Sequence, residues 1–311
     1  MRPALIAGIA NLAVIAVLAL SACDNQQELC FDHNHDRVPV EVVFDWSECP
    51  DAEPSTMSLY LFSEDGYRRY EFNGHRGGTI MITPGRYSAI AVNSDIERTA
   101  VRNTSSIETF EIWLREDFAV GQQRAGDPLC NQSDFVWAAL MENIKCEGND
   151  SIVVEMHEVV CHCTVDVLKL SDCADLRSVN ATLSGMNESI PVYDRHAVIT
   201  KNASIGFVME RPDGKGLHGS LLTLGHCGRQ RSRGDTDCEL PHILSLYFNF
   251  EDGTSCVQTV DVAEQIHNQS IDDCHIIVDS VAVPDERPMY GGGFRGTVSD
   301  WEEGADIIIK P

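Results

Sequence analysis

The sequence is poor in positive charge. It carries 23 Lys and Arg residues against 48 Asp and Glu residues, a formal net charge of −25 at pH 7. A protein this acidic is repelled by the phosphate backbone of nucleic acids and by anionic lipid headgroups. The charge therefore excludes nucleic acid as a partner, and its plainest physical consequence is solubility.

The motifs that mark common enzyme classes are also missing. The chain has no Gly-x-Ser-x-Gly nucleophile elbow, no His-Glu-x-x-His zinc motif and no phosphate-binding glycine loop. Ser184, in Leu-Ser-Gly-Met, has no identifiable base and is interpreted as a turn serine. With 48 acids, chance pairs of carboxylates are inevitable, so none is nominated as a glycosidase pair. We predict no catalytic residues, no cofactor and a protein that binds rather than catalyses.

Long apolar runs are absent after residue 20. The single long run before it is followed by two small residues and a cysteine. The run from Ala4 to Leu20 follows Arg2 and leads into Ser21-Ala22-Cys23. A positive start, an apolar centre and small residues at the exit predict a secretory signal peptide over residues 1–22. The alternative is a membrane-spanning anchor, but the run is at the short end of the roughly 17–25 residues that a spanning helix needs.

The cysteine after the small residues resembles the lipobox of bacterial lipoproteins. That resemblance implies a diacylglyceryl group on the Cys23 sulfur after cleavage of the signal. Acyl chains, at about 0.8 kcal/mol per buried methylene, would make the membrane a partner without a spanning helix. Residues 23–37 then form a polar tether. The sequence does not say which membrane leaflet receives the acyl chains.

The chain has twelve cysteines, eleven besides Cys23. In an oxidising compartment most of these should form disulfides, and an odd number leaves at least one thiol over. Cys227 with Cys238 could close one loop, and Cys256 with Cys274 could tie neighbouring strands; the connectivity stays open. In Cys161-His162-Cys163 a strand would put both sulfurs on one face, which favours two buried cysteines over a metal site.

A second metal candidate lies beside the tether, in Asp32-His33-Asn34-His35-Asp36. His33 and His35 point the same way in an extended chain, and imidazole with carboxylate can bind zinc or copper. Zinc usually takes three or four protein ligands, so a structural or solvated role is the favoured interpretation and no metal is predicted.

Alternation with period two dominates the chain after residue 37. Val38, Val40, Val42, Phe44 and Trp46 alternate with Pro39, Glu41, Val43 and Asp45. Phe110, Ile112 and Leu114 alternate with Glu111 and Trp113. Such patterns, separated by turn residues, predict half-buried antiparallel strands. We predict an all-β fold of two tandem antiparallel β-sandwich domains, over 38–148 and 149–311. Residues 135–144 are left open between a short helix and a strand, and no convincing helical period appears elsewhere.

Several weak motifs in a fixed order carry a family resemblance: Leu29-Cys30-Phe31-Asp32-His33, Phe44-Asp45-Trp46, Gly77-Gly78-Thr79, Pro84-Gly85-Arg86-Tyr87, Thr182-Leu183-Ser184-Gly185-Met186 and Val298-Ser299-Asp300-Trp301. Together they resemble the uncharacterised lipoproteins of Bacteroidales related to fimbrillins and fimbrial anchor subunits. The resemblance implies an outer-membrane or cell-surface lipoprotein with two transthyretin-like sandwiches, and fimbrillin-type subunits as partners. It also implies strand addition as the mode of assembly. The chain departs from a polymerising pilin because it lacks a convincing cleavable leader strand and is rich in cysteine.

Two functions remain in competition. The first is an anchor or accessory component of a fimbria-like adhesive structure, and the alternative is a surface glycan- or protein-binding lipoprotein with no fimbrial role. Asp150-Ser151-Ile152 and Asp279-Ser280-Val281 resemble sites that Bacteroidales O-glycosylate, but two ordinary turns would explain them almost as well.

Overall fold

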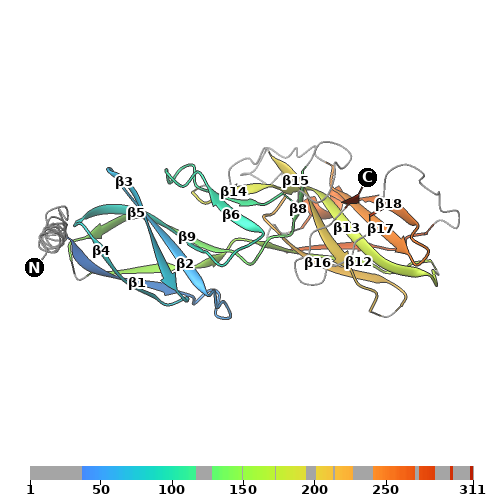
Figure 1. Ribbon diagram of the computed structural model, residues 1–311, viewed down its shortest axis with the longest axis horizontal. Coiled ribbons are helices and arrows are strands. Elements are labelled where there is room, and N and C mark those ends of the chain that lie inside the picture. The colour runs from blue at the N-terminus through green and yellow to red at the C-terminus, as the bar shows by residue number, and fades with distance from the viewer. Residues whose placement is uncertain are drawn as a thin grey trace, which may run out of the picture.

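The computed structural model describes residues 37–116, 128–148, 150–171, 173–193, 201–212, 214–226, 241–269 and 273–283, with the backbone of two short strands at 295–296 and 309–310. These residues form an elongated, almost entirely β structure in which two groups of sheets follow each other along the long axis (Figure 1). The all-β prediction is confirmed. Within these ranges, no helix has the length and apolar character needed to cross a membrane.

The first group faces a three-stranded sheet with a five-stranded one. The smaller sheet has the order β10 (Ser151–Glu155), β1 (Val38–Asp45), β4 (Gly77–Ile82). The larger has the order β11 (His157–Glu158), β9 (Trp137–Cys146), β5 (Gly85–Asn93), β2 (Thr56–Ser63), β3 (Gly66–Asn73). Val40, Val42 and Phe44 of β1 are buried in one cluster with Met57 and Leu59 of β2. The predicted alternation of β1 is confirmed.

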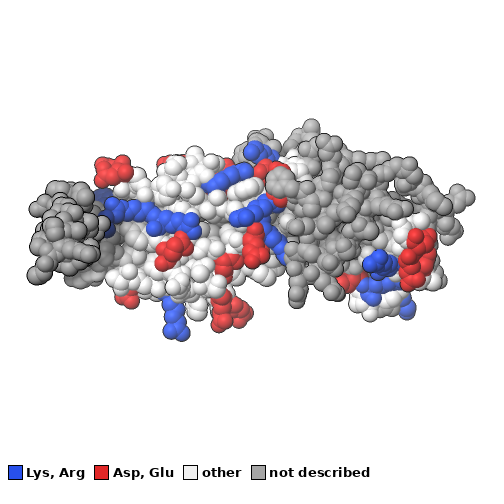
Figure 2. Space-filling model, in the orientation of Figure 1, with Lys and Arg blue, Asp and Glu red and all other residues white. Residues whose placement is uncertain are grey.

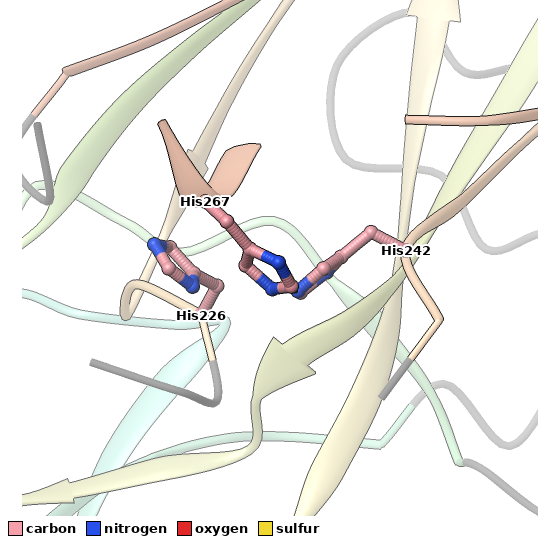
Figure 3. A group of neighbouring side chains, drawn as sticks. All are labelled: His226, His242 and His267. Atoms are coloured by element: carbon pink, nitrogen blue, oxygen red, sulfur yellow. The ribbon is translucent and has the colours of Figure 1, made fainter. Parts of the chain in front are cut away.

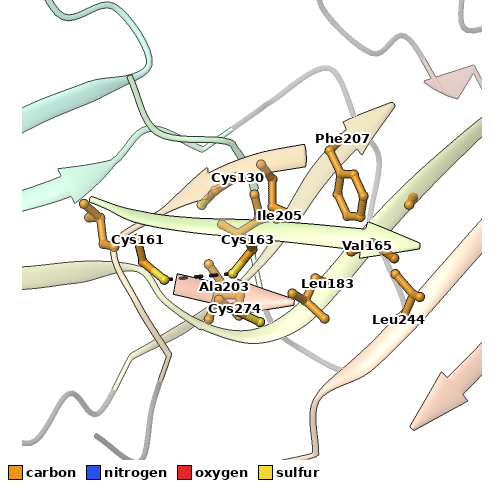
Figure 4. Packing of buried hydrophobic residues seen from close by; sticks show 14 of the residues in the cluster. Cys130, Cys161, Cys163, Val165, Leu183, Ala203, Ile205, Phe207, Leu244 and Cys274 are labelled. Atoms are coloured by element: carbon orange, nitrogen blue, oxygen red, sulfur yellow. Dashed lines mark hydrogen bonds between the residues drawn. The ribbon is translucent and has the colours of Figure 1, made fainter. Parts of the chain in front are cut away.

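The second group has the same three-plus-five arrangement. Its smaller sheet has the order β16 (Leu217–Thr223), β12 (Cys161–Val167), β19 (Asp273–Val278). Its larger sheet has the order β18 (Ser255–Asp261), β17 (Ile243–Phe250), β13 (Leu176–Asn187), β15 (Asn202–Met209), β8 (Leu129–Asn131). Val165, Leu183, Phe207 and Leu244 fill the space between the sheets (Figure 4).

A small third sheet joins the two groups. It has the order β14 (Ser189–Pro191), β7 (Glu111–Leu114), β6 (Thr99–Arg102). Phe110, directly before β7, packs its ring 4.9 Å from that of Tyr60 on β2. Tyr60 and Phe110 belong to the same buried cluster as the core of the second group. One continuous apolar cluster therefore runs from the outer face of the first large sheet into the second group.

The chain crosses between the groups more than once. β10 pairs in parallel with β1, and β11 pairs with β9, so residues 151–158 belong to the first group. β8, by contrast, pairs in parallel with β15 of the second group. The sequence-based boundary at residues 148/149 thus falls inside the first group of sheets. A division between β11 and β12 fits the strand pairing better.

Two local predictions were decided by tertiary structure. The segment left open between helix and strand forms β9, because it pairs with β5 along its length. A short helix, α2 (Ala263–His267), lies between β18 and β19, where the sequence shows no helical period. The remaining strands, β20 (Arg295–Gly296) and β21 (Ile309–Lys310), pair with each other.

Candidate partner-binding edge and metal-ligating cluster

The structure describes only some of the residues that sequence reasoning selected. Cys23, His33, His35, Cys227 and Cys238 lie outside the described residues. The signal peptide and nearly all of the predicted tether lie there as well. Lipid attachment, a metal site at His33 and His35, and a Cys227–Cys238 pair therefore stay predictions.

Cys256 and Cys274 are both buried, but they lie in different sheets. Cys256 is on β18, at the edge of the five-stranded sheet, and Cys274 is on β19, at the edge of the three-stranded sheet. The expectation that they lie on neighbouring strands is wrong. Cys274 is instead the register partner of Cys163, because β19 pairs in parallel with β12.

The Cys161-His162-Cys163 segment has the geometry expected of a strand. Both cysteines are buried on one face with sulfurs 3.9 Å apart (Figure 4). His162, between them, is exposed on the opposite face. Hydrogen bonds with Cys161 and Cys274, together with burial, raise the pKa of the Cys163 thiol. Because the thiolate is the reactive and metal-binding form, Cys163 is expected to be chemically inert.

The β19 edge is closed by side chains of the segment that precedes it. Gln265, on α2, donates from Nε2 to the Ile277 carbonyl (3.0 Å) and accepts at Oε1 from the Ile277 amide (2.8 Å). Gln269 makes the same pair of bonds with His275, each 2.6 Å. The two amides act as a substitute strand and satisfy backbone groups that an edge otherwise offers to another chain.

The β18 edge has no such cover among the described residues. Backbone bonds from Val262 to His242 (2.9 Å) and from Phe250 to Thr254 (3.0 Å) fix the alternation of the β17–β18 ladder. In an antiparallel ladder every second residue directs its N–H and C=O groups away from the partner strand. On β18 these outward residues are Ser255, Val257, Thr259 and Asp261.

The composition of β18 also suits pairing. The strand reads Ser-Cys-Val-Gln-Thr-Val-Asp, so it carries no charge before Asp261. Val257 is 49% exposed. The edge strand β3 of the first group carries Arg68, Arg69 and Glu71, and such charges oppose pairing with a further strand. Of these three edges, β18 is the one best suited to accept a strand.

An aromatic platform lies near the junction of the two groups. The rings of Phe135 and Trp137 are stacked, with centroids 5.9 Å apart and an interplanar angle of 11°. Trp46 meets Trp137 edge-on at 6.0 Å, and His162 lies 5.9 Å from Phe135. Phe135 is 50% exposed, so part of the platform faces solvent.

Three histidines converge in the second group: His226 after β16, His242 before β17, and His267 at the end of α2 (Figure 3). Their ligand nitrogens all lie within 4.8 Å of one another. His242 and His267 are joined between their Nε2 atoms at 3.1 Å. His226 and His242 are buried and His267 is exposed. Burial lowers the pKa of His242 to about 4, so this ring is neutral at pH 7.

A bulge in β13 organises this cluster. The register of β13 against β15 shifts between Leu183 and Met186. The Ser184 carbonyl lies 3.1 Å from His242 Nδ1, and the Ser184 hydroxyl accepts a bond from the Ile243 amide at 2.9 Å. Gly185 has φ +77°, and a Cβ there would lie 2.6 Å from His242 Nδ1. Glycine is therefore required for the close approach of the ring. Ser184, suspected only as a turn serine, has this structural role.

Sequence reasoning missed the histidine cluster. Its members are 16 and 25 residues apart, come from three different elements, and follow no ligand spacing. Only the packing of the two sheets brings them together.

Charged side chains are mixed over the visible surface. On the face shown in Figure 2, Lys and Arg side chains and Asp and Glu side chains both occur over the first group of sheets.

The fold defines an all-β protein of tandem sandwiches, and a family model identifies it further. Residues 22–207 match the family described as "Domain of unknown function (DUF5119)", and the chain belongs to this family.

The chain is similar to two proteins of Bacteroides ovatus, one by sequence and one by fold. The chain is 22% identical over 116 residues to the "Putative fimbrium anchoring subunit Fim4B"; this covers 37% of the chain and 34% of that protein, so the match spans about a third of the relative. A crystal structure titled as a "putative adhesin" has the same fold, with a TM-score of 0.62, 18% identity and coverage of 81% of this chain and 95% of that one. The chain thus has a fimbrial relative, and the fold prediction is confirmed.

Proposed function

We propose that this protein is a cell-surface component of a fimbria-like adhesive structure, acting as an anchor or accessory subunit. The relation to the fimbrium anchoring subunit of Bacteroides ovatus supports this role. The observation that carries it is the edge of β18, which has no cover among the described residues and no charge before Asp261, set against the covered edge of β19. The protein holds its partner mechanically and catalyses no reaction.

Strand addition would join the partner to the β18 edge. An extended segment of a fimbrial subunit pairs with the outward N–H and C=O groups of Val257 and Thr259. Backbone hydrogen bonds supply affinity in this mode, and alternate side chains supply specificity. Val257, half-exposed beside these groups, offers an apolar contact.

In this proposal the lipid on Cys23 attaches the protein to the membrane, and the β18 edge binds the partner. β1, blue in Figure 1, begins at the end of the molecule remote from the second group of sheets. A chain anchored just before β1 would therefore present the β18 edge away from the membrane. The Cys23→Ser variant should lose acyl label in cells fed radiolabelled palmitate and leave the membrane fraction. Labelling that persists in this variant would contradict lipid attachment at Cys23.

A proline on the edge tests strand addition. Thr259→Pro removes an outward N–H and leaves the bonds to β17 in place, as edge strands tolerate. The loss of one bond and the clash of the ring should lower recovery of fimbrial subunits at least about tenfold, since each tenfold is about 1.4 kcal/mol. The measurement is pull-down from native outer membranes with subunits identified by mass spectrometry. Thr259→Val keeps the amide and should behave as wild type; equal recovery with the proline variant would refute the β18 edge.

The aromatic platform favours a second candidate function, glycan binding. Sugar rings pack their apolar faces on aromatic side chains, and the stacked Phe135 and Trp137 present such a surface. Phe135→Ala should abolish retention on surface polysaccharides, whereas Tyr193→Ala, an exposed aromatic elsewhere, should not. Failure of the wild-type protein to be retained on any polysaccharide array would remove this candidate.

A further inference from the structure

We propose that His226, His242 and His267 bind a divalent transition-metal ion, with Zn²⁺ as the expected species. The proposal rests on how three elements bring three imidazoles to one point (Figure 3). It is independent of the fimbrial role, because it uses only the imidazole side chains and none of the outward backbone groups of Val257 and Thr259.

The donor set matches the chemistry of zinc. Imidazole nitrogen is a favoured ligand of Zn²⁺ and Cu²⁺, and three histidines with an open fourth position are a known zinc arrangement. Tetrahedral coordination with Zn–N bonds of about 2.0–2.1 Å places ligand nitrogens roughly 3.3 Å apart. The 3.1 Å separation of His242 and His267 already fits this value. His226, within 4.8 Å of both, has to approach by at most about 1.5 Å, which a change in its side-chain torsions supplies.

The surroundings fix the orientation of the buried ligand. His242 Nδ1 lies 3.1 Å from the Ser184 carbonyl, so Nδ1 carries the hydrogen and Nε2 points into the cluster with its lone pair. Such a second hydrogen bond sets the tautomer of metal-binding histidines. The neighbouring residue Met186 forms a β-bridge with His226. The β13 bulge thus positions two of the three ligands.

The exposed third ligand, His267, would let the metal fix the position of α2. His267 ends α2, the helix that carries Gln265. A metal on all three histidines would tie α2 to both sheets of the second group, and would hold the glutamine cover over the β19 edge.

The test is zinc titration of the full chain after treatment with a chelator. Zn²⁺ should raise the midpoint of thermal unfolding (Tm) by several degrees, and His267→Gln should weaken binding at least about tenfold. His267 is exposed, so this variant should fold, and circular dichroism checks that it does. The matched control is His275→Gln, another exposed histidine of the same group, which should bind Zn²⁺ as wild type does.

Cobalt separates this site from the chain's thiols. Co²⁺ bound to histidines alone in a tetrahedral site shows visible d–d bands without the near-ultraviolet charge-transfer band of a thiolate ligand. The proposal predicts d–d bands that are lost in His267→Gln and kept in His275→Gln. It is overturned by a strong thiolate band that is unchanged in His267→Gln, or by the absence of any Tm shift with Zn²⁺.

Discussion

The edge strands β18 and β19 belong to the same group of sheets, but only β19 is covered by side chains among the described residues. β19 is closed by four hydrogen bonds from Gln265 and Gln269, whereas the outward groups of Val257 and Thr259 on β18 meet no strand among the described residues. Edge strands invite pairing unless they are covered, shortened or charged. Two glutamine side chains, one on α2 and one just after it, are enough to cover β19. Of these two edges, β18 is therefore the one where a partner strand is expected.

Removing the glutamine cover should have the largest effect on this contrast. The Gln265→Ala/Gln269→Ala variant loses four hydrogen bonds and should be less stable by about 1–3 kcal/mol in urea unfolding. It should also associate with itself in sedimentation velocity, because β19 becomes a second open edge.

Gln258→Ala on β18 is the matched control for that variant. It removes an amide of the same kind away from β19, and should leave stability and oligomeric state nearly unchanged. A double variant that stays monomeric would show that the glutamines do not protect this edge.

A charge on the open edge should have a smaller effect. Val257→Lys places a cation beside the outward amides, and should weaken capture of fimbrial subunits several-fold, as edge lysines do in natural sheets. Val257→Thr keeps a β-branched, uncharged residue and should retain binding. Stronger binding by the lysine variant would indicate that charge attraction, rather than strand pairing, holds the partner.

The smallest expected effect is on thermal stability, through the hydrogen bonds of Asp166 that link β12 to its neighbours. Asp166 on β12 bonds His218 at 2.8 Å and His275 of β19 at 2.6 Å. The hydrogen bond from His218, followed by that from His275, lowers the pKa of Asp166. A lowered folded pKa contributes stability above the unfolded value of about 3.9, and this contribution is lost as the pH falls through the folded pKa.

Asp166→Asn should therefore lower Tm slightly at pH 7. The difference from wild type should shrink as the pH falls below the unfolded value of about 3.9, because the carboxylate is protonated first in the unfolded chain and only at lower pH in the folded protein. Thermal scans from pH 7 to pH 2.5 measure both curves. A difference that grows on acidification would contradict the assigned role of the carboxylate.

The sequence patterns predicted where the strands lie better than they predicted which strands pair with each other. The alternation in β1 depends only on which side chains face the core, so it could be read directly. The pairing of β10 with β1 and of β8 with β15 could not, because parallel pairing between distant segments leaves no local signal. The same limit explains why Cys274 was not placed opposite Cys163, and why His226, His242 and His267 were missed.

The most direct test of strand addition is hydrogen exchange of single β18 amides, with and without a fimbrial subunit. The account predicts that the outward amides of Val257 and Thr259 become protected when the subunit binds. The amides of Gln258 and Val260, already bonded to β17, should change little. Binding that leaves Val257 and Thr259 unprotected, or that protects β19 instead, would contradict it.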